Sequence, residues 1–361
     1  MHFNTQDRWV AMGPYYAMFP ISFAESVILK YTDPGDVVLD PFVGRGTSVY
    51  LANKHDRYGI GIDIGGLGWI YSSTKLNPAR QSSVLARLNE VYKFSRSSYS
   101  KAARDLPEFF HYCFSTEVRR FLLAARSNLD WKHSVIDRTL IAFILISLHD
   151  KYGVGFSNQM RQTKAMAPAY SIKWWKKNGY RNPPAIDPVT LLSKRIEWRY
   201  RYGVPRTNGS RVYYGDCTEI LHKLKPPQKA RLLLTSPPYA GVTNYKYDQW
   251  LRNWLIGGPS EPNGCREKYD FKFSNSSEYK HLLFRAFEKS AQLLSSKGMA
   301  FVRTDARKFT FECTMDALYY AFPKHKMLIR DRPLGTGRTQ TRLFGDSSKK
   351  PGEIDICMLP N

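Results

Sequence analysis

The chain has 361 residues, 43% of them hydrophobic, and a formal net charge of +23. This length can bury a large core and favours one catalytic domain that carries an insertion or a second domain. So large an excess of Lys and Arg favours a polyanionic partner over a merely basic enzyme, and it argues against a membrane-surface protein because no basic amphipathic segment stands apart from the fold.

The first informative elements are a short apolar strand over residues 37–39, the turn from Asp40 to Thr47 and a helix over 48–54. Gly44 and Gly46 of the turn can adopt backbone angles that other residues rarely adopt. The helix that follows offers free N–H groups to a polar ligand. Turns of this kind also occur without a ligand, so the turn alone does not establish a binding site.

A second strand over residues 58–62 ends in Asp63, about 20 residues after the glycine turn. In a doubly wound sheet, this is the position at which a carboxylate binds ribose hydroxyls. The two signals together predict a nucleotide-like ligand at the ends of two neighbouring strands. An irregular link at Gly65-Gly66 is expected to follow.

The middle of the chain differs in character from its two ends. Apolar residues at spacings of three and four predict a mostly helical subdomain over residues 82–150. Residues 156–206 are rich in aromatic and basic side chains, and we expect much of the contact with a polyanionic partner such as nucleic acid here. For Trp174 and Trp175, packing in the core is favoured over insertion into a duplex. The side chains expected to contact base edges or phosphates are Asn158, Arg161, Lys164, Lys173, Lys176 and Lys177, with Gln159 and Gln162 beside them.

A third strand, Leu232 to Leu234, delivers Thr235-Ser236-Pro237-Pro238-Tyr239 to its carboxyl end. The two prolines remove backbone donors and leave carbonyl oxygens as acceptors beside the Ser236 hydroxyl, while the Tyr239 ring offers a flat face to a base. The alternative interpretation is an ordinary proline-rich strand exit.

The Asp-Pro-Phe-x-Gly-x-Gly-Thr turn and the Thr-Ser-Pro-Pro-Tyr strand end resemble those of the S-adenosylmethionine-dependent amino-group DNA methyltransferases. Phe19-Pro20 with its following helix resembles the family's methionine-binding motif, and Tyr214-Gly215-Asp216 resembles the strand end that contacts the adenine of the cofactor. The resemblance covers roughly residues 14 to 75 and 210 to 359. It implies a cofactor site made of Phe19, Pro20, Asp40, Pro41, Phe42, Gly44, Gly46, Thr47, Asp63, Asp216 and Thr235.

The resemblance further implies that Ser236, Pro237, Pro238 and Tyr239 are catalytic. In this family, Ser ahead of the Pro-Pro pair usually accompanies cytosine N4, whereas Asp or Asn usually accompanies adenine N6. We expect the Ser236 hydroxyl and the Pro237 carbonyl to accept hydrogen bonds from the amino group. The rate acceleration would then come from positioning and electrostatics. Adenine N6 and RNA amino groups remain alternatives, as does a catalytically inactive DNA-binding subunit.

Two further segments follow the catalytic strand. Residues 243–254, including Gln249, Arg252 and Trp254, are a second candidate for lining the base pocket, and residues 257–276 have the composition of a mobile loop. Strands over 298–303, 326–329 and 353–359 are then expected, the last two as a closing hairpin. The basic loop inside this hairpin is expected to clamp DNA phosphates through Arg338 and Arg342, and a solvated turn is the alternative interpretation.

The cysteines and histidines carry no functional signal. The chain has no Pro-Cys pair, which argues against a C5-cytosine mechanism, and its five cysteines lack Cys-x-x-Cys spacing. We therefore expect no metal and no disulfide framework. The apolar stretch from Leu140 to Leu148 is too short to span a bilayer, and the start of the chain lacks the pattern of a signal peptide, so a cytoplasmic protein is expected.

These observations predict an α/β protein with a Rossmann-like class I methyltransferase sheet and a mostly helical, basic insertion. We expect residues 1–75 and 207–361 to form the catalytic domain and residues 76–206 to form the insertion, which recognises the target. The predicted function is methylation of cytosine N4 in flipped bases of double-stranded DNA by S-adenosyl-L-methionine, in a restriction-modification setting where a cognate endonuclease can act separately.

Overall fold

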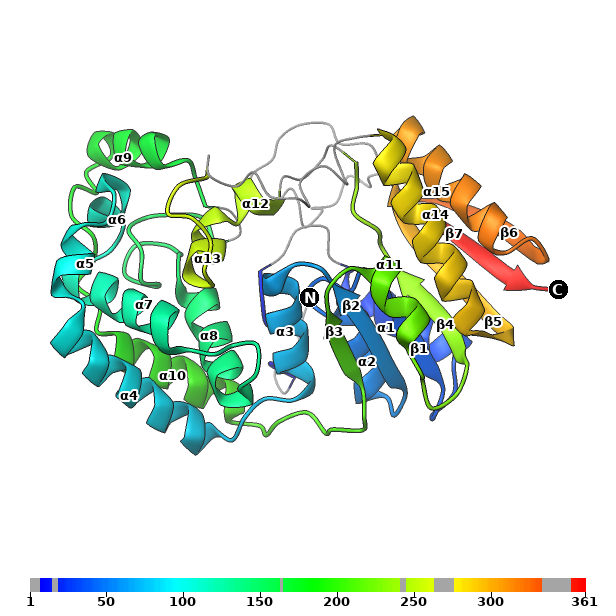
Figure 1. Ribbon diagram of the computed structural model, residues 1–361, viewed down its shortest axis with the longest axis horizontal. Coiled ribbons are helices and arrows are strands. Elements are labelled where there is room, and N and C mark those ends of the chain that lie inside the picture. The colour runs from blue at the N-terminus through cyan, green and yellow to red at the C-terminus, as the bar shows by residue number, and fades with distance from the viewer. Residues whose placement is uncertain (1–6, 15–18, 163–164, 241–244, 263–275, 333–351) are drawn as a thin grey trace. The chain divides into compact units, whose positions relative to one another are not determined.

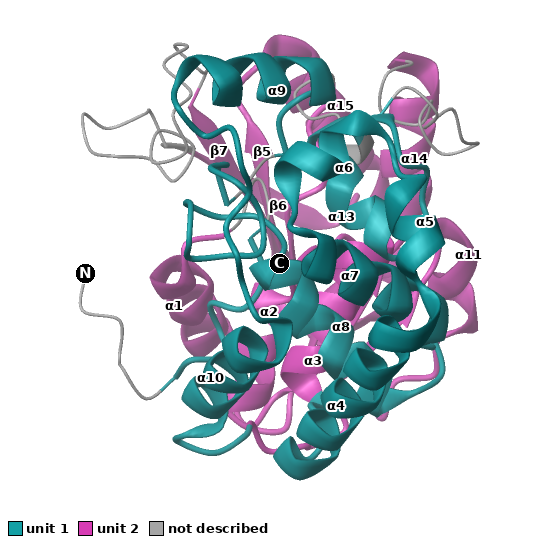
Figure 2. Cartoon of the chain, turned by 90° about the vertical axis from the view of Figure 1, so that its left-hand side faces the viewer, with its two compact units in different colours: residues 1–14, 77–204, 244–266 teal, residues 15–76, 205–243, 267–361 magenta. Residues whose placement is uncertain are grey.

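The computed structural model describes residues 7–14, 19–162, 165–240, 245–262, 276–332 and 352–361. The chain divides into two compact units, shown in different colours in Figure 2. Unit 1 contains Met1–Pro14, Asn77–Val204 and Asn244–Arg266. Unit 2 contains Tyr15–Leu76, Pro205–Thr243 and Glu267–Asn361.

Unit 2 is built on a seven-stranded sheet with the order β3-β2-β1-β4-β5-β7-β6 (Figure 1). The five strands from β3 to β5 are parallel, and β7 is antiparallel to both of its neighbours. This topology confirms the expected Rossmann-like α/β sheet and its closing hairpin. In sheet order the strands are β3 (Arg211–Tyr214), β2 (Tyr58–Asp63), β1 (Val37–Asp40), β4 (Ala230–Thr235), β5 (Leu294–Asp305), β7 (Glu353–Pro360) and β6 (His325–Arg332).

Helices cover both faces of this sheet, and its central strands β1 and β4 accordingly read as nearly continuous apolar runs. One face carries α1 (Ile21–Tyr31), α2 (Thr47–Lys54) and α3 (Gly66–Leu76). The other carries α11 (Cys217–Ile220), η1 (Leu221–Lys223), α14 (Ser276–Leu293) and α15 (Lys308–Ala321). The helix α3 begins where an irregular link was expected, so that expectation was wrong.

Alternation along β2 shows why this strand fits between two helical layers. Ile60 and Ile62 belong to the core cluster formed with α14 and α15. Gly59 and Gly61 point to the opposite face, where a Cβ atom on Gly59 would lie 2.6 Å from the Val49 carbonyl oxygen of α2. Glycine is therefore required at residue 59 because α2 packs directly on the strand backbone.

The described part of unit 1 is helical, as expected for most of the middle of the chain. Ser115, Ser134 and Asp187 cap three of its helices by accepting backbone N–H bonds. The helices are α4 (Gln81–Ser98), α5 (Ser100–Arg104), α6 (Glu108–Cys113), α7 (Thr116–Asn128), α8 (Val135–Ser147), α9 (Pro168–Lys177), α10 (Pro188–Tyr200), α12 (Tyr245–Asp248) and α13 (Trp250–Leu255).

Unit 1 also includes Met1–Pro14 and Asn244–Arg266, two segments that were expected in the catalytic domain. Near the start of the chain, the Trp9 ring lies 5.0 Å from that of Tyr200, and its Nε1 donates to the Gly203 carbonyl. After the catalytic strand, the Trp254 ring of α13 lies 4.6 Å from that of Phe110. Aromatic burial thus draws residues distant in sequence into the helical core. No helix in the described ranges is both long and apolar enough to cross a lipid bilayer.

Candidate active site and cofactor site

The order of the sheet places two of the expected motifs side by side. Strand β1 lies between β2 and β4, and the chain proceeds from it toward one edge of the sheet before it returns to build the other side. In open α/β sheets, ligands bind beyond the carboxyl ends of the strands at such a switch point. The residues at these two ends are Asp40 of β1 and Thr235 of β4.

Asp40 connects the glycine turn to β4, the strand that is expected to carry the catalytic residues. Its carboxylate accepts hydrogen bonds from the Thr235 hydroxyl at 2.6 Å, the Phe42 N–H at 3.1 Å and the Ser48 hydroxyl. The side chain is 1% exposed, and burial raises its pKa to about 6 although these donors act in the opposite direction. Because this carboxylate is engaged inside the protein, ligand contact at the turn falls to the backbone.

The turn itself needs glycine at two positions. Gly44 and Gly46 have φ angles of 51° and 81°, in the left-handed region. A Cβ atom on Gly46 would lie 2.6 Å from the Cβ atom of Ser72 in α3, so α3 and the turn pack without room for a side chain. Gly46 is also the N-cap of α2, whose first helical residue is Thr47. The first N–H groups of a helix have no partner within the helix, so this helix start can offer them to a polar ligand.

Asp63 ends β2 as a nearly buried carboxylate that is 9% exposed. Its Oδ1 accepts the Gly65 N–H at 2.6 Å. Burial raises the pKa of Asp63 to about 7, and the neighbouring Asp40 charge adds to the rise, whereas N–H donors from Gly65 and Gly44 oppose it. A Cβ atom on Gly68 would lie 2.5 Å from Oδ2, so glycine there makes room for this carboxylate.

These features match what the nucleoside end of S-adenosylmethionine requires. A desolvated carboxylate at a strand end is a ready acceptor for ribose hydroxyls, and the positive φ angles of Gly44 and Gly46 suit a turn whose backbone approaches a ligand closely. The Gly215 N–H donates to the Asp63 carbonyl at 2.9 Å, which brings the end of β3 beside that of β2. The residues present therefore fit the expected cofactor.

The remaining expected cofactor residues have visible local roles. Phe19 is 7% exposed, and its ring lies 5.5 Å from that of Phe23 in α1. Asp216 caps α11 by accepting the Thr218 N–H at 2.9 Å. The Thr47 hydroxyl accepts from the Arg45 Nε at 3.3 Å. Pro20 is the N-cap of α1, and Pro41 and Phe42 form the first residues of the turn.

The strand end that is expected to be catalytic is held by polar contacts that the sequence does not reveal. The Ser236 hydroxyl donates to the Tyr239 hydroxyl at 3.4 Å, and the Tyr239 hydroxyl donates to Glu353 Oε1 at 3.3 Å. Glu353 begins β7, and Arg303 Nη1 of β5 lies 3.5 Å from its Oε2. The available signal was the presence of charged residues inside otherwise apolar strands.

A second contact holds the residue after Tyr239. Arg307 donates through Nη2 to the Ala240 carbonyl at 2.5 Å. Its guanidinium is fixed in turn by Asp305, with Nε to Oδ1 at 3.0 Å and Nη2 to Oδ2 at 2.8 Å. This ion pair raises the pKa of Arg307. The side chains at the ends of β5 and β7 therefore fix the backbone and the ring of the catalytic segment separately.

Several expected DNA contacts are placed differently by the structure. Asn158 is fully buried, and its Nδ2 donates to the Tyr112 and Tyr180 carbonyls at 3.0 and 2.8 Å. The expectation that it contacts DNA was wrong, because this amide satisfies two backbone acceptors in the helical core. Trp175 is buried, as its core interpretation required, and Trp174 stacks on Tyr180 with the ring centroids 5.7 Å apart.

Three side chains of the second candidate for the base pocket are also buried. Gln249, Arg252 and Trp254 are at most 2% exposed in unit 1. Arg252 donates to the Leu145 carbonyl at 3.1 Å and to the Gln162 carbonyl at 2.5 Å. Their expected place in a base pocket was wrong, because these side chains supply the core and the internal hydrogen bonds of the helical unit.

The described part of the helical unit carries exposed basic side chains, as the expected contact with DNA requires. Arg161, Lys173, Lys176 and Lys177 are exposed. Lys176 lies 3.7 Å from Glu108 and over the Tyr112 ring, so part of its charge is locally compensated. The expected contacts Lys164, Arg338 and Arg342 lie outside the described residues.

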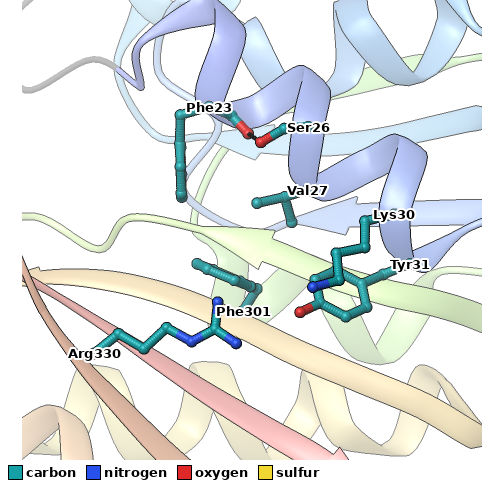
Figure 3. A pocket seen from close by; sticks show the side chains of 7 residues that line it. All are labelled: Phe23, Ser26, Val27, Lys30, Tyr31, Phe301 and Arg330. Carbon is teal, nitrogen blue, oxygen red and sulfur yellow. Dashed lines mark hydrogen bonds between the residues drawn. The ribbon is translucent and has the colours of Figure 1, made fainter.

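A separate hollow on unit 2 contains none of the expected site residues. Figure 3 shows it between the side chains of α1 and those of β5 and β6. At about 200 Å³ it is smaller than ordinary ligand pockets, so we do not assign the cofactor to it. Its lining residues are Phe23, Ser26, Val27, Lys30, Tyr31, Phe301 and Arg330. Among the described residues, no group of three or more His, Cys, Asp or Glu side chains is placed to hold a metal ion.

Comparison with known proteins identifies the first motif region. Residues 2–66 match the family model of N6 and N4 DNA methylases. The type II methyltransferase M.Cfr9I of Citrobacter freundii is 42% identical over 52 residues, which are 14% of this chain and 17% of that protein. The type II methyltransferase M.HpaI of Haemophilus parainfluenzae is 45% identical over 64 residues, which are 18% of this chain and 19% of that protein.

The matched stretches thus span less than a fifth of the length of these two relatives. Among solved structures, an rRNA methylase from Streptococcus thermophilus aligns over 96% of this chain and 99% of its own, at 6% identity and a TM-score of 0.36, a value too low to bear on function. The glycine turn and Asp63 lie inside the matched region, whereas the catalytic strand lies outside it. Within the matched region the chain is similar to amino-group DNA methyltransferases, and these matches do not separate cytosine N4 from adenine N6 enzymes.

Proposed function

We propose that this protein is a DNA methyltransferase that transfers a methyl group to N4 of a cytosine in double-stranded DNA. Its cofactor is S-adenosylmethionine, which supplies an electrophilic methyl group when bound. One observation carries the proposal: the Thr235 hydroxyl is hydrogen-bonded to Asp40, so the strand that ends in Ser-Pro-Pro-Tyr adjoins the glycine turn. A cofactor at the turn and a base at Ser236 would then lie within reach of each other.

The chain's own groups supply positioning and acceptors. The exocyclic amino group of cytosine is a weak nucleophile because its lone pair is delocalised into the ring. The Ser236 hydroxyl and the Pro237 carbonyl accept its hydrogens and hold the nitrogen in line with the methyl group, while the Tyr239 ring stacks on the base. The target base must leave the duplex first, which costs a few kcal/mol.

We assign phosphate contact to Arg161, Lys173, Lys176 and Lys177, which are exposed basic side chains of the helical unit. We propose Lys164, Arg338 and Arg342, which lie outside the described residues, as further phosphate contacts. The charge of +23 supports this assignment, because phosphate neutralisation drives DNA binding. The relatives are type II methyltransferases, so we further propose a restriction-modification setting in which an endonuclease acts separately.

The proposal is tested in a host strain that lacks DNA methylation of its own. Genomic DNA from cells that express the protein is sequenced with detection of modified bases. We expect N4-methylcytosine at one short recurring sequence, and none in cells that express Ser236→Ala. N6-methyladenine at the recurring sequence would instead assign the protein to the adenine branch of the family, and unmodified DNA would overturn the proposed activity.

A further inference from the structure

The hydroxyl of Tyr239 meets a carboxylate from a distant part of the chain. Glu353 lies 114 residues further along, yet its Oε1 accepts the Tyr239 hydroxyl at 3.3 Å. The sheet order explains this meeting, because β5 separates β4 from β7 and all three strands place charged or polar side chains at the same end. Asp305 of β5 and Glu353 of β7 are directly paired in this register.

Glu353 is itself held in place. Arg303 binds Asp355 with two hydrogen bonds, Nε to Oδ1 at 2.7 Å and Nη2 to Oδ2 at 3.0 Å. Its remaining Nη1 lies 3.5 Å from Glu353 Oε2. The Arg303 guanidinium also lies over the Phe23 ring at 3.5 Å, which fixes its plane. A planar guanidinium bound on two sides is a rigid support for a third partner.

The fold alone does not require Glu353. Arg303 and Asp355 are 5% and 0% exposed and already satisfy each other as a bidentate pair. By contrast, the side chain of Glu353 is 40% exposed, and it directs one oxygen to Arg303 and the other to Tyr239. Its second contact therefore serves the catalytic segment and not the interior of the sheet.

We propose that Glu353 is a positioning residue that holds the Tyr239 ring, through its hydroxyl, in the orientation that stacks on the target base. This inference deepens the proposed methyl transfer and rests on it. A stacking ring with a free hydroxyl could rotate about its side-chain bonds, and a hydrogen bond at its tip restricts that rotation. The Ser236 hydroxyl, 3.4 Å from that of Tyr239, is ordered by the same contact.

Arg307 provides a contrast within the same site. It binds the Ala240 carbonyl, so it acts on the backbone of the catalytic segment and not on the Tyr239 hydroxyl. The effect of changing Glu353 should therefore depend on that hydroxyl, whereas the effect of changing Arg307 should not. Glu312, which is 54% exposed on α15, is a matched control for loss of a glutamate from the same unit.

The first experiment is a double-mutant cycle on single-turnover methyl transfer to duplex DNA. We expect Glu353→Ala to lower the rate about two- to tenfold, the range of one hydrogen bond, with little change in DNA affinity. Glu353→Gln keeps an acceptor oxygen and should restore the rate. In the Tyr239→Phe background, Glu353→Ala should cause no further fall, whereas Arg307→Gln should lower the rate in both backgrounds and Glu312→Ala in neither. An equal fall for Glu353→Ala in both backgrounds would overturn the proposal.

A second measurement needs no DNA and no activity. With 3-fluorotyrosine incorporated at Tyr239, the fluorine resonance should be alike in the parent protein and Glu353→Gln, and shifted or broadened in Glu353→Ala. An unchanged resonance in Glu353→Ala would also overturn the positioning role. A protein that methylates no nucleic acid yet shows the expected resonances would overturn the proposed function and leave the contact between Glu353 and Tyr239 established.

Discussion

Replacing Asp63 by Asn should separate the stability of the protein from its cofactor affinity. Asp63 is nearly buried, and its pKa is raised to about 7. A carboxylate that is difficult to ionise destabilises the fold near neutral pH, while the same carboxylate can accept hydrogen bonds from ribose hydroxyls. Asn keeps the size and one acceptor but carries no charge, so Asp63→Asn should lose the pH dependence and weaken binding.

The size of the effect follows from proton linkage. Between the ordinary pKa of 3.8 and the raised value of about 7, the folded protein holds a proton that the unfolded chain has released, so the free energy of unfolding falls as pH rises. Asp63 alone should lower the free energy of unfolding by about 2.5 kcal/mol between roughly pH 5 and pH 8.5. The stability difference between the parent protein and Asp63→Asn should change by that amount.

Urea unfolding followed by circular dichroism, at pH values across this window, measures the difference, and the exposed Asp33→Asn serves as a matched control. Calorimetry at about pH 8 should show that Asp63→Asn binds S-adenosylhomocysteine about ten- to a hundredfold more weakly, the range for a hydrogen bond to a charged group. Parallel stability curves for the parent and Asp63→Asn would refute the raised pKa. Unchanged affinity would remove Asp63 from the cofactor site.

Three other predictions concern separate parts of the chain. Gly46→Ala should abolish measurable S-adenosylhomocysteine binding by calorimetry, because the added Cβ atom would lie 2.6 Å from a neighbouring side chain at a φ of 81°. Replacing Lys173, Lys176 and Lys177 by Gln should lower the slope of log K against log salt for DNA binding by about 0.9 for each lost phosphate contact, whatever the DNA sequence. Asn158→Ala should lower the melting temperature and leave sequence choice in a methylation assay unchanged, because its amide bonds two buried carbonyls.

The first motif region could be predicted because the residues that form it are close together in the sequence. The strand, the glycine turn and Asp63 lie within one short stretch, and backbone freedom at Gly44 and Gly46 is visible in residue type alone. The neighbouring positions of β1 and β4 also follow from doubly wound topology. Thr235 and Asp40, which share a hydrogen bond, are 195 residues apart in the sequence, and each belongs to a recognisable motif.

The rest depended on contacts that residue type does not reveal. The amide of Asn158 could bind a base edge, but Asn158 is buried and its amide donates to distant backbone carbonyls instead. Glu353 follows a stretch outside the described residues, and its role arises from the strand order β4-β5-β7. The segment that contains Trp254 follows the catalytic motif in sequence but packs in the helical unit.

The most direct test of the central claim is the chemical identity of the methylated product. Duplex DNA is incubated with the purified protein and methyl-labelled S-adenosylmethionine, digested to nucleosides and analysed by mass spectrometry. We predict label on cytidine at the exocyclic nitrogen, lost in Ser236→Ala and still formed, at a rate about two- to tenfold lower, in Tyr239→Phe. Label on adenosine would contradict the cytosine assignment, and the absence of label from every nucleoside would contradict the claim that this site methylates DNA.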